Sequence, residues 1–285
     1  MRSDQEMLQT IMDIAEGDER IRAYAMEGSR TNPAIEPDQY QDFDISFFVD
    51  DYDSFLADES WLDAFGTIVF MQKPEDMELF PPEMQGFSYL MTFDDGQKID
   101  LTIYRTNQLD AYLESEPLAR IMLDKDSIAP ADVQPTDQSF WVQRPSPRSF
   151  DDCCNEFWHC TTYVAKGLCR REFLHAAALL NENVRNELIR MLSWQVGFET
   201  DFSLSVGKKA KFLERYVVPD VWGRLCQTFA MATYDQMWDA LFTATQLFTE
   251  ASHAVAGRLD CVYPSYEAAV LPLLQQRHQE FLDGK

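Results

Sequence analysis

The spacing of apolar residues divides the chain into a first part with short apolar runs and a second part with long periodic stretches. The first part opens with Ser3 and Glu6 in the positions of a capping box, followed by apolar residues at helical spacing. Apolar and aromatic runs follow, and Asp94-Asp95-Gly96 is a favourable turn between two of them. Strands are predicted at residues 21–27, 42–49, 68–71, 87–93 and 98–104, and a short helix at 61–65. These elements indicate a mixed α/β unit with an antiparallel or mixed sheet.

The second part has the i, i+3, i+4 spacing of apolar residues that is typical of helices. Helices are predicted at residues 150–166, 171–196, 208–217, 220–231 and 234–256. The stretch 130–147 is rich in proline and polar residues, as interdomain connections often are. We therefore predict an α+β protein in which residues 1–135 form the sheet-containing domain and residues 136–285 an all-helical domain.

The charge of the chain is strongly negative and unevenly distributed. The 24 basic and 48 acidic residues give a formal net charge of −24, and residues 1–140 contain 9 of the basic and 31 of the acidic side chains. This balance argues against a nucleic-acid partner, which needs a basic surface, and against docking on an anionic membrane. The acidic first part is either a solubilising surface or a region that attracts a cationic ligand. A hydrophobic content of 46% excludes a disordered chain.

The cysteines and the N-terminus exclude two further classes. None of the six cysteines forms a C-x-x-C pair, so no zinc site is expected. The opening residues lack the apolar region of a signal peptide, and no apolar run approaches the length of about 18 residues that a membrane-spanning helix needs. We expect a soluble, cytoplasmic protein with reduced thiols.

The most specific pattern lies between residues 28 and 44. Gly28-Ser29-Arg30 follows a predicted strand, where a glycine lets the backbone approach a phosphate closely. Asp42 and Asp44 stand two residues apart on the next predicted strand, so their side chains project from one face. Two neighbouring carboxylates repel each other unless a cation lies between them. Oxygen ligands of this kind suit Mg²⁺, which also binds phosphate oxygens.

A third carboxylate belongs to the later strand of the predicted hairpin. Asp100 interrupts an otherwise apolar segment, where a carboxylate is costly unless a proton, a charge or a metal compensates it. If this strand lies next to the strand with Asp42 and Asp44, the three carboxylates converge. Such a triad is suited to metal-assisted displacement at phosphorus.

The order Gly-Ser, Asp-x-Asp and a later strand aspartate resembles the nucleotidyltransferase superfamily with a polymerase-β-like core. Longer segments are similar to the aminoglycoside 6-adenylyltransferase family, bacterial enzymes that adenylylate streptomycin, and they are spread over nearly the whole chain. These segments are residues 27–30 (EGSR), 41–45 (QDFDI), 71–83 (MQKPEDMELFPPE), 151–158 (DDCCNEFW), 204–208 (LSVGK) and 211–216 (KFLERY).

The resemblance implies a nucleotidyltransferase domain followed by a helical domain, and a reaction. The adenylyl group of ATP would pass to the 6-hydroxyl of streptomycin with release of pyrophosphate, which confers resistance to the antibiotic. Asp42 and Asp44 would hold Mg²⁺ against the ATP phosphates, and Asp100 would complete the metal site or take the proton of the hydroxyl. The segment Gly28-Ser29-Arg30 would bind the phosphates.

Basic residues of the helical part are further candidates for ATP binding. Lys208, Lys209 and Lys211 cluster after Gly207, and a basic cluster at the start of a helix is suited to a triphosphate. Lys209 could equally lie on a solvated helix face. Arg190 stands within an apolar helical stripe, where it either pairs with a carboxylate or reaches ATP.

Carboxylates are the candidates for binding the drug, because streptomycin carries two guanidinium groups and a methylamine. Glu156, near the start of the first helix of the second domain, is the leading candidate. Asp152 is a second one, although first-turn acids such as Asp151 and Asp152 also stabilise helix N-termini. A third is Glu78 in the acidic loop, whose other acids are Glu75, Asp76 and Glu83.

Two other functions remain open at this point. One is a nucleotidyltransferase that acts on a protein or an RNA, although the acidic balance argues against RNA. The other is a catalytically inactive nucleotide-binding module, against which the intact Asp42, Asp44 and Asp100 argue. The sequence is compatible with a monomer but does not determine the oligomeric state, the general base or the range of aminoglycosides.

Overall fold

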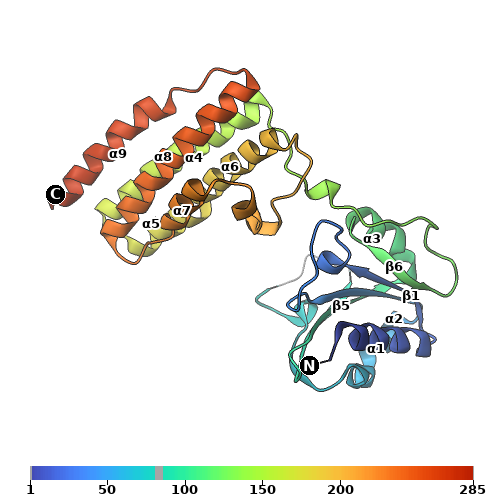
Figure 1. Cartoon of the computed structure of the whole chain (residues 1–285). Coiled ribbons are helices and arrows are strands. Elements are labelled where there is room, and N and C mark those ends of the chain that lie inside the picture. Colours follow the sequence, from blue (N-terminus) through green and yellow to red (C-terminus); the bar gives the residue numbers. More distant parts are fainter. Residues whose placement is uncertain (1, 81–85, 285) are drawn as a thin grey trace. The chain divides into compact units, whose positions relative to one another are not determined.

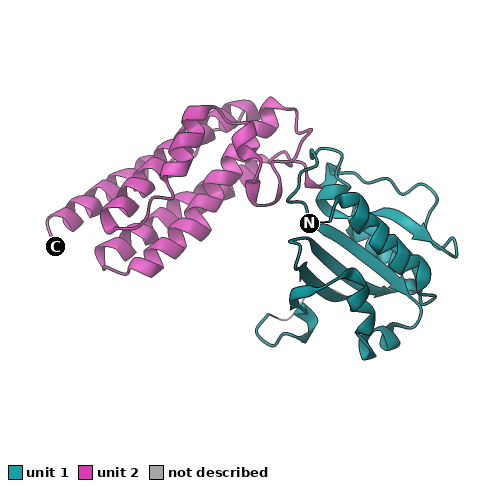
Figure 2. Ribbon diagram, turned by 60° about the horizontal axis from the view of Figure 1, so that its bottom comes forward, with its two compact units in different colours: residues 1–139 teal, residues 140–285 magenta. Residues whose placement is uncertain are grey.

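A computed structural model describes residues 2–80 and 86–284 of the chain. The chain divides into two units, residues 1–139 and 140–285, which Figure 2 shows in different colours. The first unit contains a β-sheet with helices and the second consists of helices, so the predicted α+β class is confirmed.

The sheet of the first unit is mixed. Within the described residues its strand order is β3-β4-β5-β2-β1-β6, with β2 and β5 parallel and the other pairs antiparallel. Figure 1 shows it with its covering helices. The predicted hairpin is formed by β4 and β5, whereas β6 was not predicted. The strands are β1 (Ile21–Glu27), β2 (Phe43–Val49), β3 (Ile68–Gln72), β4 (Phe87–Phe93), β5 (Lys98–Arg105) and β6 (Arg120–Asp124).

The two faces of the sheet are buried differently, because successive strand residues point to opposite sides. One face, with Ile45 of β2 and Leu101 of β5, forms a large apolar core with helix α1 (Asp4–Gly17). The opposite face forms a smaller core around Phe48 with helix α3 (Leu109–Ser115). The polar positions of β2 and β5 therefore lie on the side opposite to α1.

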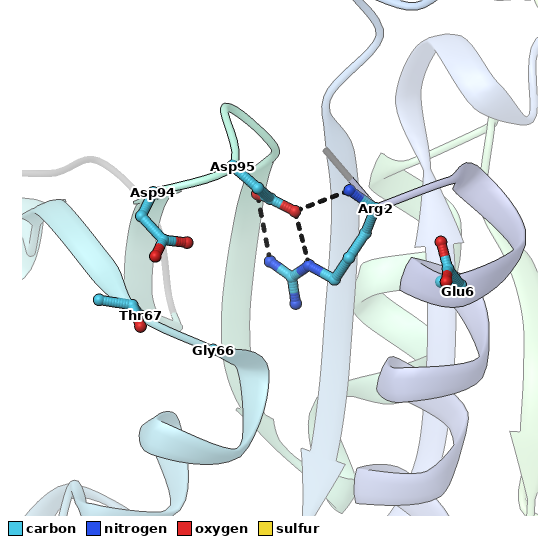
Figure 3. A pocket seen from close by; sticks show the side chains of 6 residues that line it. All are labelled: Arg2, Glu6, Gly66, Thr67, Asp94 and Asp95. Carbon is cyan, nitrogen blue, oxygen red and sulfur yellow. Dashed lines mark hydrogen bonds and ion pairs between the residues drawn. The ribbon is translucent and has the colours of Figure 1, made fainter.

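Helix α1 begins as the sequence predicts, because Ser3 and Glu6 form a capping box. Just before it, Arg2 ties the start of the chain to the β4–β5 turn. The backbone nitrogen and Nε of Arg2 donate to Oδ2 of Asp95 at 2.9 and 2.8 Å (Figure 3). The turn predicted at residues 94–96 thus also anchors the N-terminal segment.

The connections of the first unit contain short helices. The predicted helix at 61–65 is a 3₁₀-helix, and a second 3₁₀-turn follows β1 directly, at the predicted Gly-Ser-Arg segment. These elements are η1 (Gly28–Arg30), α2 (Tyr52–Ala57), η2 (Ser60–Phe65), η3 (Pro74–Asp76) and η4 (Thr106–Gln108). The 3₁₀-turn η5 (Gln138–Phe140) lies at the boundary of the two units.

The second unit buries one core between its helices, and Trp158 and Trp238 are among its largest fully buried side chains. A π-helical segment interrupts the predicted helix 171–196, and the final helix α9 was not predicted. None of the described helices combines the length and apolar character needed to cross a membrane. The elements are α4 (Pro147–Cys169), α5 (Phe173–Leu179), the π-helix η6 (Leu180–Val184), α6 (Arg185–Glu199), η7 (Lys208–Ala210), η8 (Leu213–Arg215), α7 (Pro219–Gln227), α8 (Tyr234–Leu259) and α9 (Tyr266–Leu282).

The predicted helix at 208–217 is wrong. The segment instead contains the two 3₁₀-turns η7 and η8. Lys209 and Ala210 have φ values of 55° and 59°, which an α-helix does not allow. The backbone N–H of Phe212 donates to the carbonyl of Val206 and closes a loop. The apolar residues of this segment therefore belong to a folded loop and pack against the core of the unit.

Candidate active site

The parallel pairing of β2 and β5 brings two of the predicted carboxylates together. Asp44 is the register partner of Asp100, and both lie on the face of the sheet opposite to α1. Asp42 immediately precedes β2. The three aspartates, here called the triad, therefore gather at one end of the central strands although 56 residues separate Asp44 from Asp100 along the chain.

Lys98 lies between two members of the triad. Its Nζ is 2.9 Å from Oδ2 of Asp42 and 2.8 Å from Oδ2 of Asp100. The sequence reasoning missed this residue. A signal was present, because Lys98 stands two residues before Asp100 and side chains at that spacing share one face of a strand.

Gly28 brings the backbone of the β1–η1 junction against Asp44. Its φ is +74°, and a Cβ atom at this position would lie 2.2 Å from Oδ2 of Asp44. Only glycine fits both the conformation and the space without a shift of the aspartate. The Gly-Ser segment therefore lies directly against Asp44 of the Asp-x-Asp segment.

The surroundings of Asp44 disfavour its charged form. Burial, followed by the charges of Asp100 and Asp42, raises the pKa of Asp44 to about 6, and the nearby Lys98 opposes this shift. Oδ1 of Asp100 is buried and has no hydrogen-bond partner among the described residues. A buried carboxylate oxygen without a partner and a carboxylate destabilised by its neighbours both fit a site for a divalent cation.

The triad does not have the closed arrangement of a complete metal site. In residues 2–80 and 86–284, no group of three or more His, Cys, Asp or Glu side chains is arranged so that it could hold a metal ion. Two of the triad carboxylates, Asp42 and Asp100, pair instead with the ammonium of Lys98. The donor set suits Mg²⁺, but the side chains have to rearrange to bind it.

Arg30 fastens the loop that leads from η1 to β2. Its guanidinium donates to the carbonyls of Asp42 and Gln41 at 2.9 and 2.8 Å, pairs with Asp4 at 2.7 Å and lies over the ring of Phe43. These contacts give Arg30 a structural role, and its predicted contact with ATP stays a prediction. In the same loop, the Gln41 side chain donates to the carbonyl of Ser29.

A half-buried glutamate lies directly before Gly28. Glu27, the last residue of β1, accepts hydrogen bonds from Ser46 of β2 at 3.0 Å and from the hydroxyl of Tyr112 of α3. Burial raises the pKa of Glu27 to about 8, although both hydrogen bonds oppose the shift. The role of Glu27 was not predicted. A glutamate that ends an otherwise apolar strand, directly before Gly28, was the available signal.

The acidic loop after β3 sends one side chain back to the sheet. Glu75 accepts hydrogen bonds from the backbone N–H and the hydroxyl of Ser88, at 2.7 and 3.2 Å. The predicted drug ligand Glu78 lies exposed in the same loop, and Glu83 lies outside the described residues. Glu75 therefore holds the loop to β4, and Glu78 is left facing solvent.

The predicted ATP-binding residues of the second unit are all exposed. Lys208 lies in η7, and Nζ of Lys211 lies 5.0 Å from the ring centre of Phe212. Arg190 is not buried in the apolar stripe of α6, because it pairs with Glu187 one turn away at 2.8 Å. Arg190 therefore has a local structural partner, whereas the two lysines project from a loop.

The predicted drug-binding acids of the second unit lie on α4 and are also exposed. Asp152 pairs with Arg148 at 3.0 Å within the first turns of the helix. Oε1 of Glu156 is 3.1 Å from Sγ of Cys160 and 3.5 Å from Nδ2 of Asn183. Asp152 thus forms an ion pair within its own helix. Of these two acids, Glu156 is the one that forms no ion pair with a described residue.

The cavity of about 470 Å³ shown in Figure 3 is not part of the triad. It lies beside the N-terminal segment, and two of its charged side chains, Arg2 and Asp95, form an ion pair with each other. We therefore place the candidate site on the triad, from its chemistry and not from cavity size. The residues that line the cavity are Arg2, Glu6, Gly66, Thr67, Asp94 and Asp95.

Comparison with known proteins gives one consistent result. A profile described as streptomycin adenylyltransferase matches residues 1–276. An aminoglycoside 6-adenylyltransferase from Campylobacter jejuni is 48% identical over 270 residues, which are 95% of this chain and 94% of that protein. One from Bacillus subtilis is 47% identical over 272 residues, 95% of this chain and 96% of that protein. The crystal structure of an aminoglycoside 6-adenyltransferase from Bacillus subtilis is 42% identical, with a TM-score of 0.49, and the match covers 98% of this chain and 99% of that one.

Proposed function

The chain belongs to the streptomycin adenylyltransferase family, and from this premise we propose that it transfers the adenylyl group of ATP to the 6-hydroxyl of streptomycin. It is a nucleotidyltransferase enzyme that acts on aminoglycosides. ATP as the donor, Mg²⁺ as the cofactor and streptomycin as the acceptor are the proposed details. The observation that carries them is the convergence of Asp42, Asp44 and Asp100 beside Gly28.

In the proposed reaction the hydroxyl oxygen of the drug forms a bond to the α-phosphorus of ATP. The bond between that phosphorus and the bridging oxygen of pyrophosphate breaks, and pyrophosphate leaves with the electron pair. The hydroxyl passes its proton to Asp100 or to water. Mg²⁺ bound at the triad would neutralise charge on the phosphates. The protein supplies orientation and fixed charges, which are effective because they need no rearrangement as the charge moves.

Each residue near the triad has a defined part in this proposal. Asp42, Asp44 and Asp100 would hold the cation, which suits the register pairing of Asp44 with Asp100 and the unpartnered oxygen of Asp100. Gly28 lets the backbone come close to the phosphates, and Ser29 beside it offers a hydroxyl. Hydrogen bonds hold this end of β1 and β2 in register. Arg30 donates to the carbonyl of Asp42, and Glu27 accepts from the hydroxyl of Ser46.

The helical unit supplies the two remaining groups of ligands in the proposal. Lys208 and Lys211 bind the triphosphate, since both are exposed lysines on one short loop. Glu156 binds a guanidinium group of the drug. Arg190 and Asp152 form local ion pairs with Glu187 and Arg148, and their roles in ligand binding stay predictions.

One assay tests the proposal directly. The purified protein is incubated with ATP, Mg²⁺ and single aminoglycosides, and pyrophosphate release is followed. We expect release with streptomycin and none with aminoglycosides that lack the streptidine ring. Absence of release above background with streptomycin would contradict the substrate assignment, and equal release with GTP would contradict the assignment of the donor. Mass spectrometry of the product identifies which hydroxyl carries AMP.

A further inference from the structure

The ammonium of Lys98 takes the position of a shared counter-ion in the triad. It contacts one carboxylate oxygen of Asp42 and one of Asp100, at 2.9 and 2.8 Å, and about a third of its side chain is exposed, 36%. The side chains of Asp42 and Asp100 are 41% and 26% exposed, so the pairs lie at the surface of the sheet end and not in a sealed interior. A solute can therefore reach and exchange with this ammonium.

The carboxylates around Lys98 need a positive charge. Asp44, beside Asp100 in the register, has both other aspartates of the triad as nearby like charges. Arg30 is the other cation near Asp42, but its guanidinium donates to the backbone carbonyls of Asp42 and Gln41 and forms its ion pair with Asp4. Among the residues that the structure describes, Lys98 is the one cation that forms ion pairs with the triad.

We infer that Lys98 is a resident counter-ion that holds the triad together without metal and is displaced when a divalent cation binds. The inference deepens the proposed function, since it rests on the triad being the metal site. Lys98 is a positioning residue, because its ion pairs orient the carboxylates of Asp42 and Asp100. Its place on β5 supports this role, because Lys98 and Asp100 are two residues apart and share one face of the strand, while the flexible four-carbon side chain of a lysine can take another position.

Displacement has a measurable cost. A divalent cation that enters the triad of the native protein must first break the two ion pairs of Lys98, so metal affinity without nucleotide is lowered. ATP brings its own cation and its own negative charge, which attracts the released ammonium. The native site therefore favours the metal–nucleotide complex over the free metal ion.

The test is a metal titration of the full-length protein without nucleotide. Lys98→Met removes the ammonium and keeps a side chain of similar length. Free Mn²⁺ is followed by electron paramagnetic resonance after removal of metals with a chelator. We expect the Kd for Mn²⁺ to fall roughly tenfold in K98M, since that is the order of effect of two partly exposed ion pairs. Lys73→Met is the matched control, because Lys73 also pairs with two carboxylates, Glu59 and Asp76, away from the triad.

A second readout tests the holding role in the absence of activity. Without metal, K98M should unfold about 3 °C below the native protein, because the triad loses its cation. Adding Mn²⁺ should raise the unfolding temperature of K98M more than that of the native protein or K73M. If K98M instead binds Mn²⁺ as weakly as the native protein, the inference is overturned, even when its unfolding temperature is lower.

The outcomes separate this inference from the proposed function. If the native protein transfers AMP but K98M gains no affinity for Mn²⁺, the inference fails and the proposed function stands. If neither protein binds Mn²⁺, the inference also fails, and the assay with ATP and streptomycin decides the proposed function alone. If K98M binds Mn²⁺ more tightly but the native protein does not adenylylate any aminoglycoside, the inference stands and the proposed function fails.

Discussion

The candidate site residues of the two units differ in where their partners lie along the chain. In the first unit, sheet register places Asp44 beside Asp100, and a glycine with positive φ brings the backbone against Asp44. In the helical unit, the candidates Asp152 and Arg190 are exposed and pair with side chains three or four residues away. A sheet combines residues from distant segments at fixed spacing, whereas one helix face mainly offers local partners. The chemistry is therefore expected to depend most on the first unit.

The largest expected effect is that of Asp44→Asn. This change removes one triad carboxylate and keeps its shape, so kcat should fall by about a thousandfold or more, since catalysis depends on charges placed at the reacting phosphate. The fold should remain, and the unfolding temperature should not decrease, because burial and the neighbouring aspartates disfavour the charged form of Asp44 in the native protein. Steady-state pyrophosphate release and thermal unfolding measure the two quantities.

Asp50→Asn is the control for this change. Asp50 directly follows the same strand but is exposed, and its ion pair with Arg22 is long, at 3.7 Å. Its kcat should stay within about twofold of the native value. Near-native turnover of Asp44→Asn would show that Asp44 is not a metal ligand, and that catalysis does not depend on the triad of the first unit as proposed.

A smaller effect is expected for Gly28→Ala. The new methyl group would enter the space of the Asp44 carboxylate and would sit at a strained φ, so the free energy of unfolding should fall by about 2 kcal/mol and kcat by about a hundredfold. Gly223→Ala in α7 of the helical unit is the matched change. Gly223 has no atom within 4 Å of the new methyl, so this variant should gain about 0.5 kcal/mol. Denaturant titration and pyrophosphate release check both.

The helical unit is tested by the double variant Lys208→Ala with Lys211→Ala. If these lysines bind the triphosphate, the KM for ATP should rise about tenfold while kcat changes little, because a ground-state contact is lost. Arg190→Ala should leave both within about twofold. If Arg190→Ala raises the KM for ATP as much as the double variant does, the ion pair between Arg190 and Glu187 opens when ATP binds. If the KM of the double variant is unchanged, residues of the first unit bind the triphosphate.

The smallest effect concerns acid stability. The side-chain and backbone N–H groups of Arg2 hold the pKa of Asp95 well below its usual value of 3.8. A lowered carboxyl pKa contributes stability above pH 3.8, and this contribution is lost as the pH falls below that value toward the folded-state pKa. Asp95→Asn should therefore cost about 1 kcal/mol at pH 7 and progressively less as the pH falls below 3.8.

Glu250→Gln provides the corresponding change in the helical unit. Glu250 pairs with Arg224 at 2.6 Å, but its side chain is 56% exposed, against 16% for Asp95. At pH 7 its effect should be smaller than that of Asp95→Asn, because solvent screens the pair. Urea titrations between pH 2.5 and 7 compare the two variants, and equal effects would show that exposure does not separate the units in this respect.

Local patterns predicted much of the fold. The capping box at Ser3, the strands that became β1 to β5 and most of the long helices follow from residues close in sequence. The predicted helix at 208–217 failed because Lys209 and Ala210 adopt positive φ to let the segment fold back, a choice that tertiary packing makes. Strand β6 was missed for a related reason, since pairing with β1 and not its own pattern makes it a strand.

The sequence by itself determined which chemical groups are available: three aspartates, a Gly-Ser turn and a strongly acidic first part. It also determined the family, because the segments that carry the resemblance are read without coordinates. The tertiary structure alone decided that β2 and β5 are parallel neighbours, that Lys98 bridges Asp42 and Asp100, and that Arg30 and Arg190 have structural partners. The physical reason is that strand pairing and ion pairs join residues across long loops, and spacing along the chain does not specify such partners.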